Sequence, residues 1–300
     1  MTLLLSVSAA LNAIFAVEYG VRALQPVQGS DQTGSAGSLN GAQRHPAHDG
    51  RLLTQMDTND ECTVEQRELH RINSAARKQY SNDYWAWQSN NVIIGGQITA
   101  LLFAPFVSDN MSAVADIGCG SGTVVNNLHV ADKWCVEVNP FARAHIGKTL
   151  PHLTAVDTVD RLPNGRFDLI ISNHALEHTP CPLLLIAQLR HKLKRGGRLV
   201  ITVPGLQDEL VSLEEHHRKT GTYFKPAEQH HHLYVWGPQQ LGNLFKVAGY
   251  DVIDAKIKKY SRTQAGDDAW KTGGAAAFWR IAERENRHPQ TMVVAQRPAA

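Results

Sequence analysis

Runs of hydrophobic residues, separated by polar and glycine-containing segments, recur along the chain from residue 113 onward. Continuous apolar runs such as Leu169-Ile170-Ile171 are typical of strands buried on both faces of a parallel sheet. We expect strands at 113–118, 134–138, 153–156, 167–173, 198–203, 250–257 and 291–296, the last two as a hairpin-like pair. Their alternation with helical segments predicts an α/β fold.

Helices are expected before and between these strands. Apolar residues at helical spacing predict helices over 61–80, 92–107 and 239–248. A further helix begins at Pro180 and Pro182, carries Leu193, and ends in cations followed by a glycine pair, which is the usual punctuation of a helix. Residues 204–236 are expected as a long loop over the sheet that selects the substrate.

The N-terminal part of the chain differs in character from the rest. Residues 1–24 form a hydrophobic segment, and its apolar stretch 3–17 has the length of a signal-peptide core or a short membrane anchor. No Lys or Arg precedes that stretch, which weakens the signal-peptide interpretation, and a helix packed on the domain is the alternative. Residues 25–60 are rich in Gly, Ser, Gln, Asn and Asp and are expected to be a flexible tether. We therefore expect a catalytic domain at 61–300, located at a membrane or in the secretory pathway, with the cytoplasm as the alternative.

Composition narrows the classes of function. With 43% hydrophobic residues the chain can bury a sizeable core. The net charge is only +2 and no dense Lys/Arg patch is present, so no nucleic-acid partner is expected. The four cysteines show neither metal-ligand spacing nor a disulfide framework.

The segment Asp116-Ile117-Gly118-Cys119-Gly120-Ser121-Gly122 follows the first strand and carries the most information. A strand, a tight glycine turn and a helix form the nucleotide-binding corner of an open α/β sheet. A dinucleotide would favour a third glycine where Thr123 stands, and its pyrophosphate would be repelled by Asp116. S-adenosylmethionine (SAM) has no phosphate, and its ammonium and sulfonium suit a carboxylate. The turn therefore favours SAM over NAD.

A second acidic residue, Glu137, supports the prediction of a SAM site. Glu137 ends the second strand, 19 positions after Gly118, close to the spacing of roughly 20 residues expected for an acid that binds ribose hydroxyls. A carboxylate accepts two hydroxyl hydrogen bonds. Alone, Glu137 would be an ordinary surface acid, but the glycine turn at this distance predicts a nucleoside site.

Five segments resemble the class I SAM-dependent methyltransferase family, in particular its small-molecule, type 11/23-like branch. In order they are V-A-D-I-G-C-G-S-G, V-E-V-N-P, F-D-L-I-I-S-N-H-A-L-E-H, L-K-R-G-G-R-L-V-I-T-V-P and H-L-Y-V-W-G-P-Q-Q-L-G-N-L-F-K-V-A-G-Y, and the resemblance covers residues 80–297. It implies a Rossmann-like, seven-stranded, mostly parallel sheet with helices on both faces, an antiparallel last strand and an N-terminal helical cap.

The resemblance also implies which residues bind the cofactor. Asp116, Gly118 and Gly120 would hold the methionine end of SAM and Glu137 its ribose. The loop at 157–158 would flank the adenine. The full set of expected cofactor-binding residues is Asp116, Gly118, Cys119, Gly120, Glu137, Val138, Asn139, Asn173 and His174.

The histidines suggest metal chemistry at first sight. His174-Ala175-Leu176-Glu177-His178 matches H-x-x-E-H, a zinc-peptidase signature, but that signature needs a helix, and here a strand precedes the motif and prolines follow it. The pairs and runs at 216–217 and 230–232 would need acids beside them to bind an ion. We therefore expect no metal, and His230, His232 and Tyr234 become candidates for the acceptor pocket.

The expected reaction is methyl transfer from SAM to a small-molecule or glycan acceptor, through a hydroxyl that loses its proton to a general base. His174, His178 and His230 are the candidates for that base, because histidine titrates near neutral pH. A saccharide acceptor follows from the resemblance, and a lipid or quinone is the alternative suggested by the apolar N-terminus. An NAD-dependent oxidoreductase of related fold and a non-catalytic binding module are the other hypotheses.

Overall fold

The computed structural model describes residues 85, 92–224, 232–259, 263–285 and 289–299. The expected hydrophobic segment at 1–24, the tether at 25–60 and the helix at 61–80 lie outside the described residues. Within the described part of the chain, no helix has the length and apolar character needed to cross a membrane.

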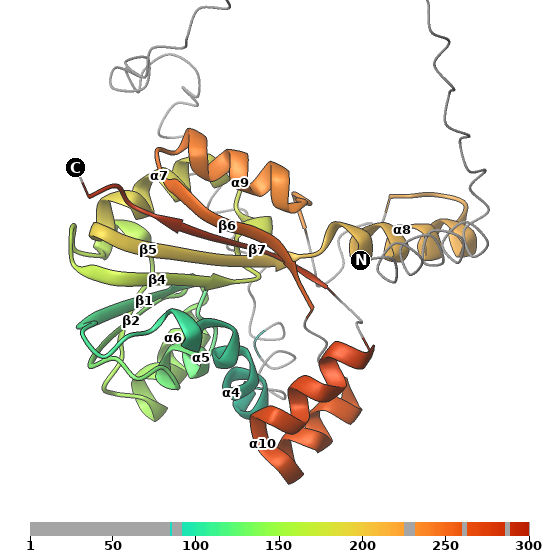
Figure 1. The fold of residues 1–300 in the computed structure, drawn as a ribbon, viewed down its shortest axis with the longest axis horizontal. Helices are drawn as coiled ribbons and strands as arrows, with labels where there is room; N and C mark the ends of the chain where they lie inside the picture. The colour runs from blue at the N-terminus through green and yellow to red at the C-terminus, as the bar shows by residue number, and fades with distance from the viewer. Residues whose placement is uncertain (1–84, 86–91, 225–231, 260–262, 286–288, 300) are drawn as a thin grey trace, which may run out of the picture. The chain divides into compact units, whose positions relative to one another are not determined.

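Seven strands form one sheet in the order β3-β2-β1-β4-β5-β7-β6 (Figure 1). Neighbours from β3 to β5 are parallel, and β7 runs antiparallel to both β5 and β6. The strands are β1 Ala113–Ile117, β2 Asp132–Val136, β3 Thr154–Val156, β4 Phe167–Asn173, β5 Leu193–Pro204, β6 Asp251–Lys258 and β7 Gln290–Gln296. The predicted seven-stranded, mostly parallel sheet and its antiparallel last strand are confirmed.

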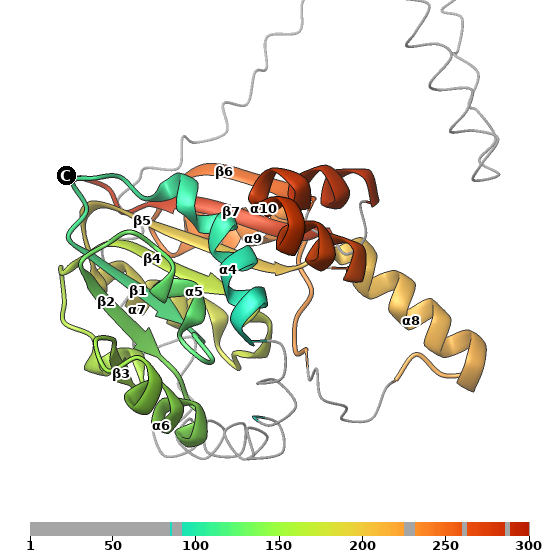
Figure 2. The same ribbon diagram turned by 90° about the horizontal axis from the view of Figure 1, so that it is seen from below.

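Helices cover both faces of the sheet, as Figures 1 and 2 show. α4 Val92–Phe103 and η2 Ala104–Phe106 precede β1. The elements between the strands are α5 Thr123–Asn126, α6 Pro140–Thr149, η3 Val159–Arg161, η4 Leu176–His178, α7 Pro182–Lys192, α8 Leu206–Thr220, α9 Pro238–Val247 and α10 Gln264–Glu285. Alternate residues of β1 point to opposite faces, so Ala115 joins the core under α7 and α9 while Val114 joins the core under α4 and α10. All five residues of β1 are therefore buried, as its apolar run predicts.

Three elements differ from the expectation. The segment 204–236 is not simply a loop, because it contains the fifteen-residue helix α8, which buries none of its residues. The strands β6 and β7 pair as predicted, but the helical segment α10, broken at Gly274, separates them in sequence. Leu193, expected in the last turn of a helix, begins β5, because α7 ends at Lys192 and Leu193 pairs with Phe167 of β4.

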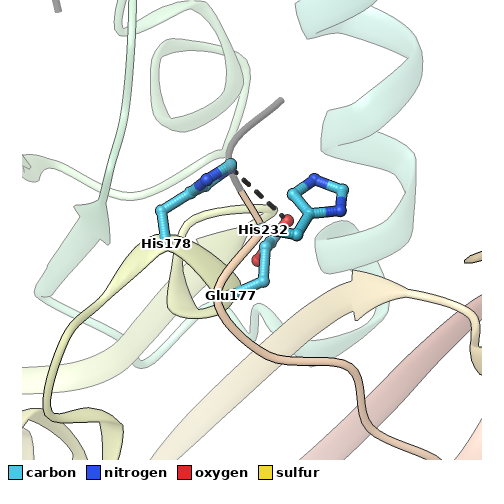
Figure 3. A group of neighbouring side chains, drawn as sticks. All are labelled: Glu177, His178 and His232. Atoms are coloured by element: carbon cyan, nitrogen blue, oxygen red, sulfur yellow. Dashed lines mark ion pairs between the residues drawn. The ribbon is translucent and has the colours of Figure 1, made fainter. Parts of the chain in front are cut away.

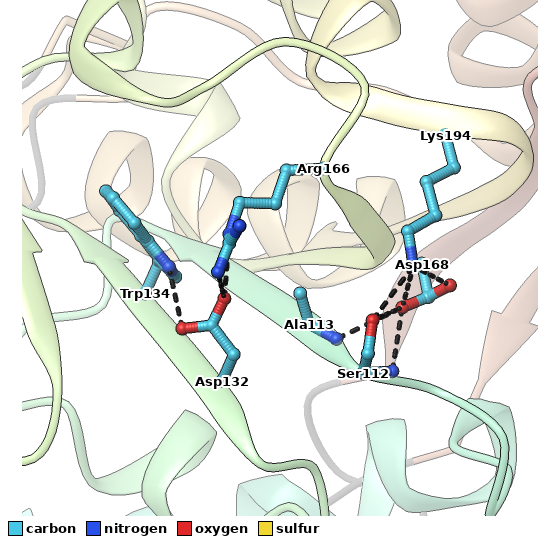
Figure 4. Close-up of polar contacts among 7 residues, drawn as sticks. All are labelled: Ser112, Ala113, Asp132, Trp134, Arg166, Asp168 and Lys194. Atoms are coloured by element: carbon cyan, nitrogen blue, oxygen red, sulfur yellow. Dashed lines mark hydrogen bonds and ion pairs between the residues drawn. The ribbon is translucent and has the colours of Figure 1, made fainter.

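A charged network ties the strands together at the edge where β1, β2 and β4 begin (Figure 4). The Asp168 carboxylate accepts hydrogen bonds from the backbone N–H groups of Ser112 and Ala113 at 2.8 and 3.0 Å, and Lys194 Nζ lies 2.8 Å from it. Beside this group, Arg166 pairs with Asp132 at 2.7 Å. These contacts join β1, β2, β4 and β5 at the end of the sheet opposite the glycine turn.

We predict that Asp168→Asn lowers the free energy of unfolding by about 1–3 kcal/mol, because the Ser112 and Ala113 N–H groups, the Ser112 hydroxyl and Lys194 Nζ lose a charged acceptor. Burial alone would raise the pKa of Asp168, but Lys194 and the Ser112 and Ala113 donors hold it below its usual value. The stabilisation is therefore fully present above the ordinary aspartate pKa of about 4 and is lost as the pH falls through the lower, folded-state pKa.

Urea denaturation at several pH values measures this difference. Asp109→Asn, in an exposed turn, is the matched control and should leave the stability unchanged. Equal stability of Asp168→Asn and the wild-type protein at pH 7 would show that the network contributes nothing.

Candidate active site

The turn between β1 and α5 is built from three glycines in the left-handed region. Gly118, Gly120 and Gly122 have φ values of 73°, 55° and 76°, which residues with a Cβ rarely adopt. A Cβ on Gly118 would lie 2.4 Å from the Cβ of Ala175. The N–H groups of Gly118 and Cys119 both donate to the carbonyl oxygen of Val136, at 2.8 and 3.2 Å. The turn is thus fixed against the end of β2 and against the segment that follows β4.

Asp116 lies one residue before the end of β1 and is almost completely buried. Burial, and then the charge of nearby Glu137, raise the pKa of Asp116 to about 8. Its carboxyl group is therefore mostly protonated at neutral pH while no cation is beside it. A ligand that brings a positive charge to this point would favour the ionised form.

Glu137 directly follows β2 and is 7% exposed. Its Oε2 accepts a hydrogen bond from the Gly120 N–H at 2.8 Å, and its Oε1 accepts one from the Asn139 N–H at 2.7 Å. Burial raises the pKa of Glu137, although these two backbone donors oppose the shift. Each carboxylate oxygen has a second acceptor position, so Glu137 can hold the turn and still accept hydroxyl groups of a ribose.

The remaining expected residues near these acids have packing or backbone roles. Asn139 is buried and caps α6 by accepting the Phe141 N–H at 2.9 Å, while Val138 is half-buried beside it. Cys119 and Cys135 are both buried free thiols. Burial, followed by a hydrogen bond with Cys135, raises the pKa of Cys119, so this thiol is neutral and fills space behind the turn.

The end of β4 lies next to the end of β1 and carries Asn173 and His174. The Asn173 Oδ1 accepts a hydrogen bond from the Thr202 hydroxyl of β5 at 2.8 Å. His174 has a φ of 52° and is the one non-glycine residue with positive φ in the described part of the chain. About a third of its side chain is exposed, yet its Nε2 is buried, and burial lowers the pKa of His174 to about 4.

Three side chains converge beyond β4, and we call Glu177, His178 and His232 the glutamate–histidine cluster (Figure 3). The Glu177 carboxylate is buried, and its Oε1 lies 3.9 Å both from His178 Nε2 and from His174 Nδ1. The rings of His178 and His232 have centroids 5.0 Å apart. Burial raises the pKa of Glu177 to about 7.

Glu209, in the first turn of α8, completes the surroundings of this cluster. Its Oε1 lies 2.6 Å from His232 Nδ1. Burial alone would lower the pKa of His232, but the hydrogen bond to Glu209 and the charges of Glu209 and Glu177 raise it above its usual value. Glu209 was missed in the sequence, because it lies 23 residues before His232 in a segment expected to be a loop.

The structure gathers most of the predicted site residues at one edge of the sheet. Asp116, the glycine turn, Glu137 and His174 follow the carboxyl ends of β1, β2 and β4, where open α/β sheets bind ligands. Asp157, predicted to flank the adenine, follows β3 and pairs with Arg161 at 2.9 Å.

The other predicted acceptor-pocket residues have separate positions. His230 lies outside the described residues. Tyr234 donates a hydrogen bond to the Pro180 carbonyl oxygen at 2.8 Å and stacks on Trp236. His216 and His217 lie in the last turns of α8, where His217 stacks on Tyr223, so they do not join the glutamate–histidine cluster.

Comparison with known proteins gives a family match. The model of a family described as a methyltransferase domain matches residues 96–255, slightly more than half of the chain. A curated relative, the tRNA U34 carboxymethyltransferase of Hydrogenovibrio crunogenus, is 26% identical over 174 residues, which are 50% of each protein. The chain therefore spans about half the length of the curated relative that it matches.

Solved structures share the fold at low sequence identity. A chain in the complex of the Haloferax volcanii Trm112 methyltransferase activator with a methyltransferase has a TM-score of 0.51 at 17% identity, covering 74% of this chain and 97% of that one. The Burkholderia thailandensis 1,6-didemethyltoxoflavin-N1-methyltransferase, solved with its substrate and S-adenosylhomocysteine, has a TM-score of 0.49 at 15% identity, covering 76% and 90%.

We predict that binding of SAM releases about one proton from Asp116 at pH 7, because the pKa of about 8 falls when a cation is placed beside the carboxyl group. The affinity should therefore rise as the pH approaches 8 and weaken below it. Calorimetry in two buffers of different ionisation enthalpy measures the release, and Asp116→Asn should abolish it. Equal heats in both buffers for the wild-type protein would contradict this assignment.

We further predict that Glu137→Ala weakens SAM binding by about 1–3 kcal/mol, because the ribose and the Gly120 N–H both lose their acceptor. Glu137→Gln keeps one carbonyl oxygen and should lose less. Glu283→Ala, on the exposed side of α10, is the control and should bind SAM like the wild-type protein. Wild-type affinity in the Glu137 variants would place the nucleoside elsewhere.

Proposed function

This chain belongs to the methyltransferase-domain family and is a SAM-dependent methyltransferase, and from that premise we propose that it methylates a hydroxyl group of a small-molecule acceptor, with a saccharide as the favoured class. The family match decides between the two cofactors considered for the glycine turn, and NAD-dependent oxidation is no longer an alternative. The acceptor class is the part that we propose.

The observation that carries this proposal is the polar character of the side chains that gather beyond β4. Glu177, His178 and His232 lie together there, and His174 joins them from the strand end next to the glycine turn. Hydrogen-bonding side chains of this kind suit an acceptor with several hydroxyl groups, because each hydroxyl both donates and accepts.

The reaction needs little covalent chemistry from the protein. A lone pair of the acceptor oxygen forms the new bond to the methyl carbon, the carbon–sulfur bond breaks with its electrons moving to sulfur, and S-adenosylhomocysteine leaves. The protein contributes by holding oxygen, carbon and sulfur in line, which can supply much of the barrier reduction. The hydroxyl proton passes to a base, for which His174 and His178 are the described candidates.

The overall charge supports a small acceptor over a nucleic acid. The name of the curated relative refers to tRNA, but that relative shares only 26% identity over half its length. The present chain has 30 Lys and Arg against 28 Asp and Glu, which lacks the positive excess that nucleic-acid binding usually needs.

A lipid or quinone hydroxyl is the second candidate, and one observation favours it. Large apolar side chains are exposed on α8 and on the segments after it, among them Leu210, Val211, Phe224 and Leu233. A long apolar acceptor could lie along these side chains while its hydroxyl reaches the polar side chains beyond β4. The membrane tether proposed for residues 3–17 would place the enzyme near such an acceptor.

Methyl-labelled SAM distinguishes these acceptors. We predict that purified protein, incubated with a cell extract separated into saccharide, lipid, RNA and protein fractions, transfers label to the saccharide fraction. Label in the lipid fraction would favour the second candidate, and label in RNA would contradict the proposal. Protein with Asp116→Ala is the control that reports background transfer.

His174→Asn and His178→Asn test the base. The variant that removes it should lower kcat by roughly 10²–10⁴-fold, because the transfer step needs the proton removed. In His178→Asn, which lies outside the expected cofactor-binding set, the affinity for SAM should stay unchanged. Single-turnover rates with the labelled acceptor measure this effect. Wild-type rates in both variants would show that neither histidine takes the proton.

A further inference from the structure

We propose that Glu177, His178 and His232 bind a divalent transition-metal ion, with zinc as the ion that their donors suit best. Each of the three residues offers one ligand atom, and these atoms all lie within 4.8 Å of one another (Figure 3). The sequence argued against metal because the histidines lacked neighbouring acids. The fold supplies those acids, Glu177 within the cluster and Glu209 beside it.

The donor set has the chemistry of a catalytic site. Two imidazoles and one carboxylate are a recurring ligand set of catalytic zinc, which keeps at least one position open for water or substrate. Bonds of about 2.0–2.1 Å in tetrahedral geometry place ligand atoms roughly 3.3 Å apart. The separation between Glu177 Oε1 and His178 Nε2 is 3.9 Å, and all three ligand atoms lie within 4.8 Å of one another, so they would have to move closer together to bind an ion.

The buried Glu177 carboxylate is the strongest single sign of a missing cation. Its side chain is 1% exposed, and neither carboxylate oxygen accepts a hydrogen bond from another residue in the described ranges. A buried charge without hydrogen bonds is costly, and proteins rarely keep one unless it is paired or coordinates a metal. An ion between Glu177 and the two histidines would remove that cost.

Glu209 has the position of an outer-shell residue. Its Oε1 lies 2.6 Å from His232 Nδ1. This contact leaves Nε2 as the nitrogen that His232 would offer to the ion. Histidine ligands usually donate their other N–H to a carboxylate, which fixes the tautomer and ring orientation and makes the ligand more basic.

The backbone brings the ligands together from distant parts of the chain. Glu177 and His178 lie in η4 directly after β4, and the Leu233 N–H donates to the Glu177 carbonyl oxygen at 2.8 Å, which places His232 beside them. Glu209 lies in the first turn of α8, the helix that follows β5. The cluster thus lies at the same edge of the sheet as the SAM-binding residues.

The role of the ion rests on the proposed function, whereas its binding does not. An acceptor hydroxyl in the open coordination position would lose its proton more readily, because the metal lowers the pKa of an oxygen bound to it. The proton leaves to solvent or to His174. The resulting alkoxide attacks the methyl carbon, and the sulfur keeps the electrons of the bond that breaks.

Metal binding can be measured without any acceptor. The full chain, prepared without a histidine tag and freed of metal by a chelator, is titrated with Zn²⁺ by calorimetry, and cobalt replaces zinc to give a visible spectrum. We expect about one ion per chain and the intense absorption bands of low-coordinate cobalt. The absence of tight binding, or the spectrum of cobalt surrounded by water alone, would overturn the proposal.

Single substitutions locate the ion. Glu177→Gln and His232→Gln should each weaken Zn²⁺ binding by more than about 100-fold, and Glu209→Gln by roughly 10–100-fold because it acts through His232. His216→Gln, near the C-terminal end of α8 and outside the glutamate–histidine cluster, is the matched control and should bind like the wild-type protein. Unchanged SAM affinity shows that each variant is folded. Wild-type zinc affinity in a folded Glu177 or His232 variant would place the ion elsewhere and overturn the assignment.

Methyl transfer by metal-free and zinc-loaded protein then separates this inference from the proposed function. A rate that falls on metal removal and returns with zinc supports the activating role, whichever fraction accepts the label. Zinc-dependent transfer of label to RNA would contradict the proposed acceptor but would still support the proposed metal site. Full activity of the metal-free protein would overturn the activating role.

Discussion

The hydrogen bond between the Glu137 carboxylate and the Gly120 N–H is the contact on which the cofactor site depends. It joins the end of β2 to the middle of the glycine turn after β1, and the Val136 carbonyl oxygen fixes the start of the same turn. The turn has few other ways to keep its shape, because its glycines occupy backbone regions with no side chains to pack. The acid that we expect to bind the ribose therefore also helps to hold the glycine turn in place.

The parts of the fold that could be predicted are those whose residues are buried on both faces. The central residues of β1 and β4 form continuous apolar runs in the sequence. They do so because their side chains are buried in the hydrophobic core on one face of the sheet or the other. The helix α8 was not predicted, although Leu206, Leu210 and Leu213 recur at helical spacing, because its segment was taken as a loop; the helix buries none of its residues. The segment α10 contains the glycine pair Gly273-Gly274, and glycine is unfavourable inside a helix. The helix is broken at Gly274, as this pair would predict.

The candidate site also has a part that could be predicted from the sequence and a part that could not. Asp116 and Glu137 could be found because a strand, a turn and the next strand impose a fixed spacing on them. The glutamate–histidine cluster could not, because its members are brought together by β4, by the start of α8 and by the Leu233 hydrogen bond, none of which has a sequence spacing of its own. The local context correctly argued against a helical zinc-peptidase motif, since η4 is a single turn. It carried no information about Glu209 or about the approach of His232.

Two buried acids without cations lie at this edge of the sheet. Burial raises the pKa of Asp116 to about 8 and that of Glu177 to about 7, so both carboxyl groups hold a proton more strongly than they would in water. Each becomes a favourable anion only when a positive charge arrives. In the proposed reaction Asp116 would lie at the methyl donor and Glu177 at the acceptor. Because SAM brings its own positive charge to Asp116, the donor end is completed by its ligand. A neutral hydroxyl acceptor would bring none to Glu177, and the metal ion proposed above would supply it.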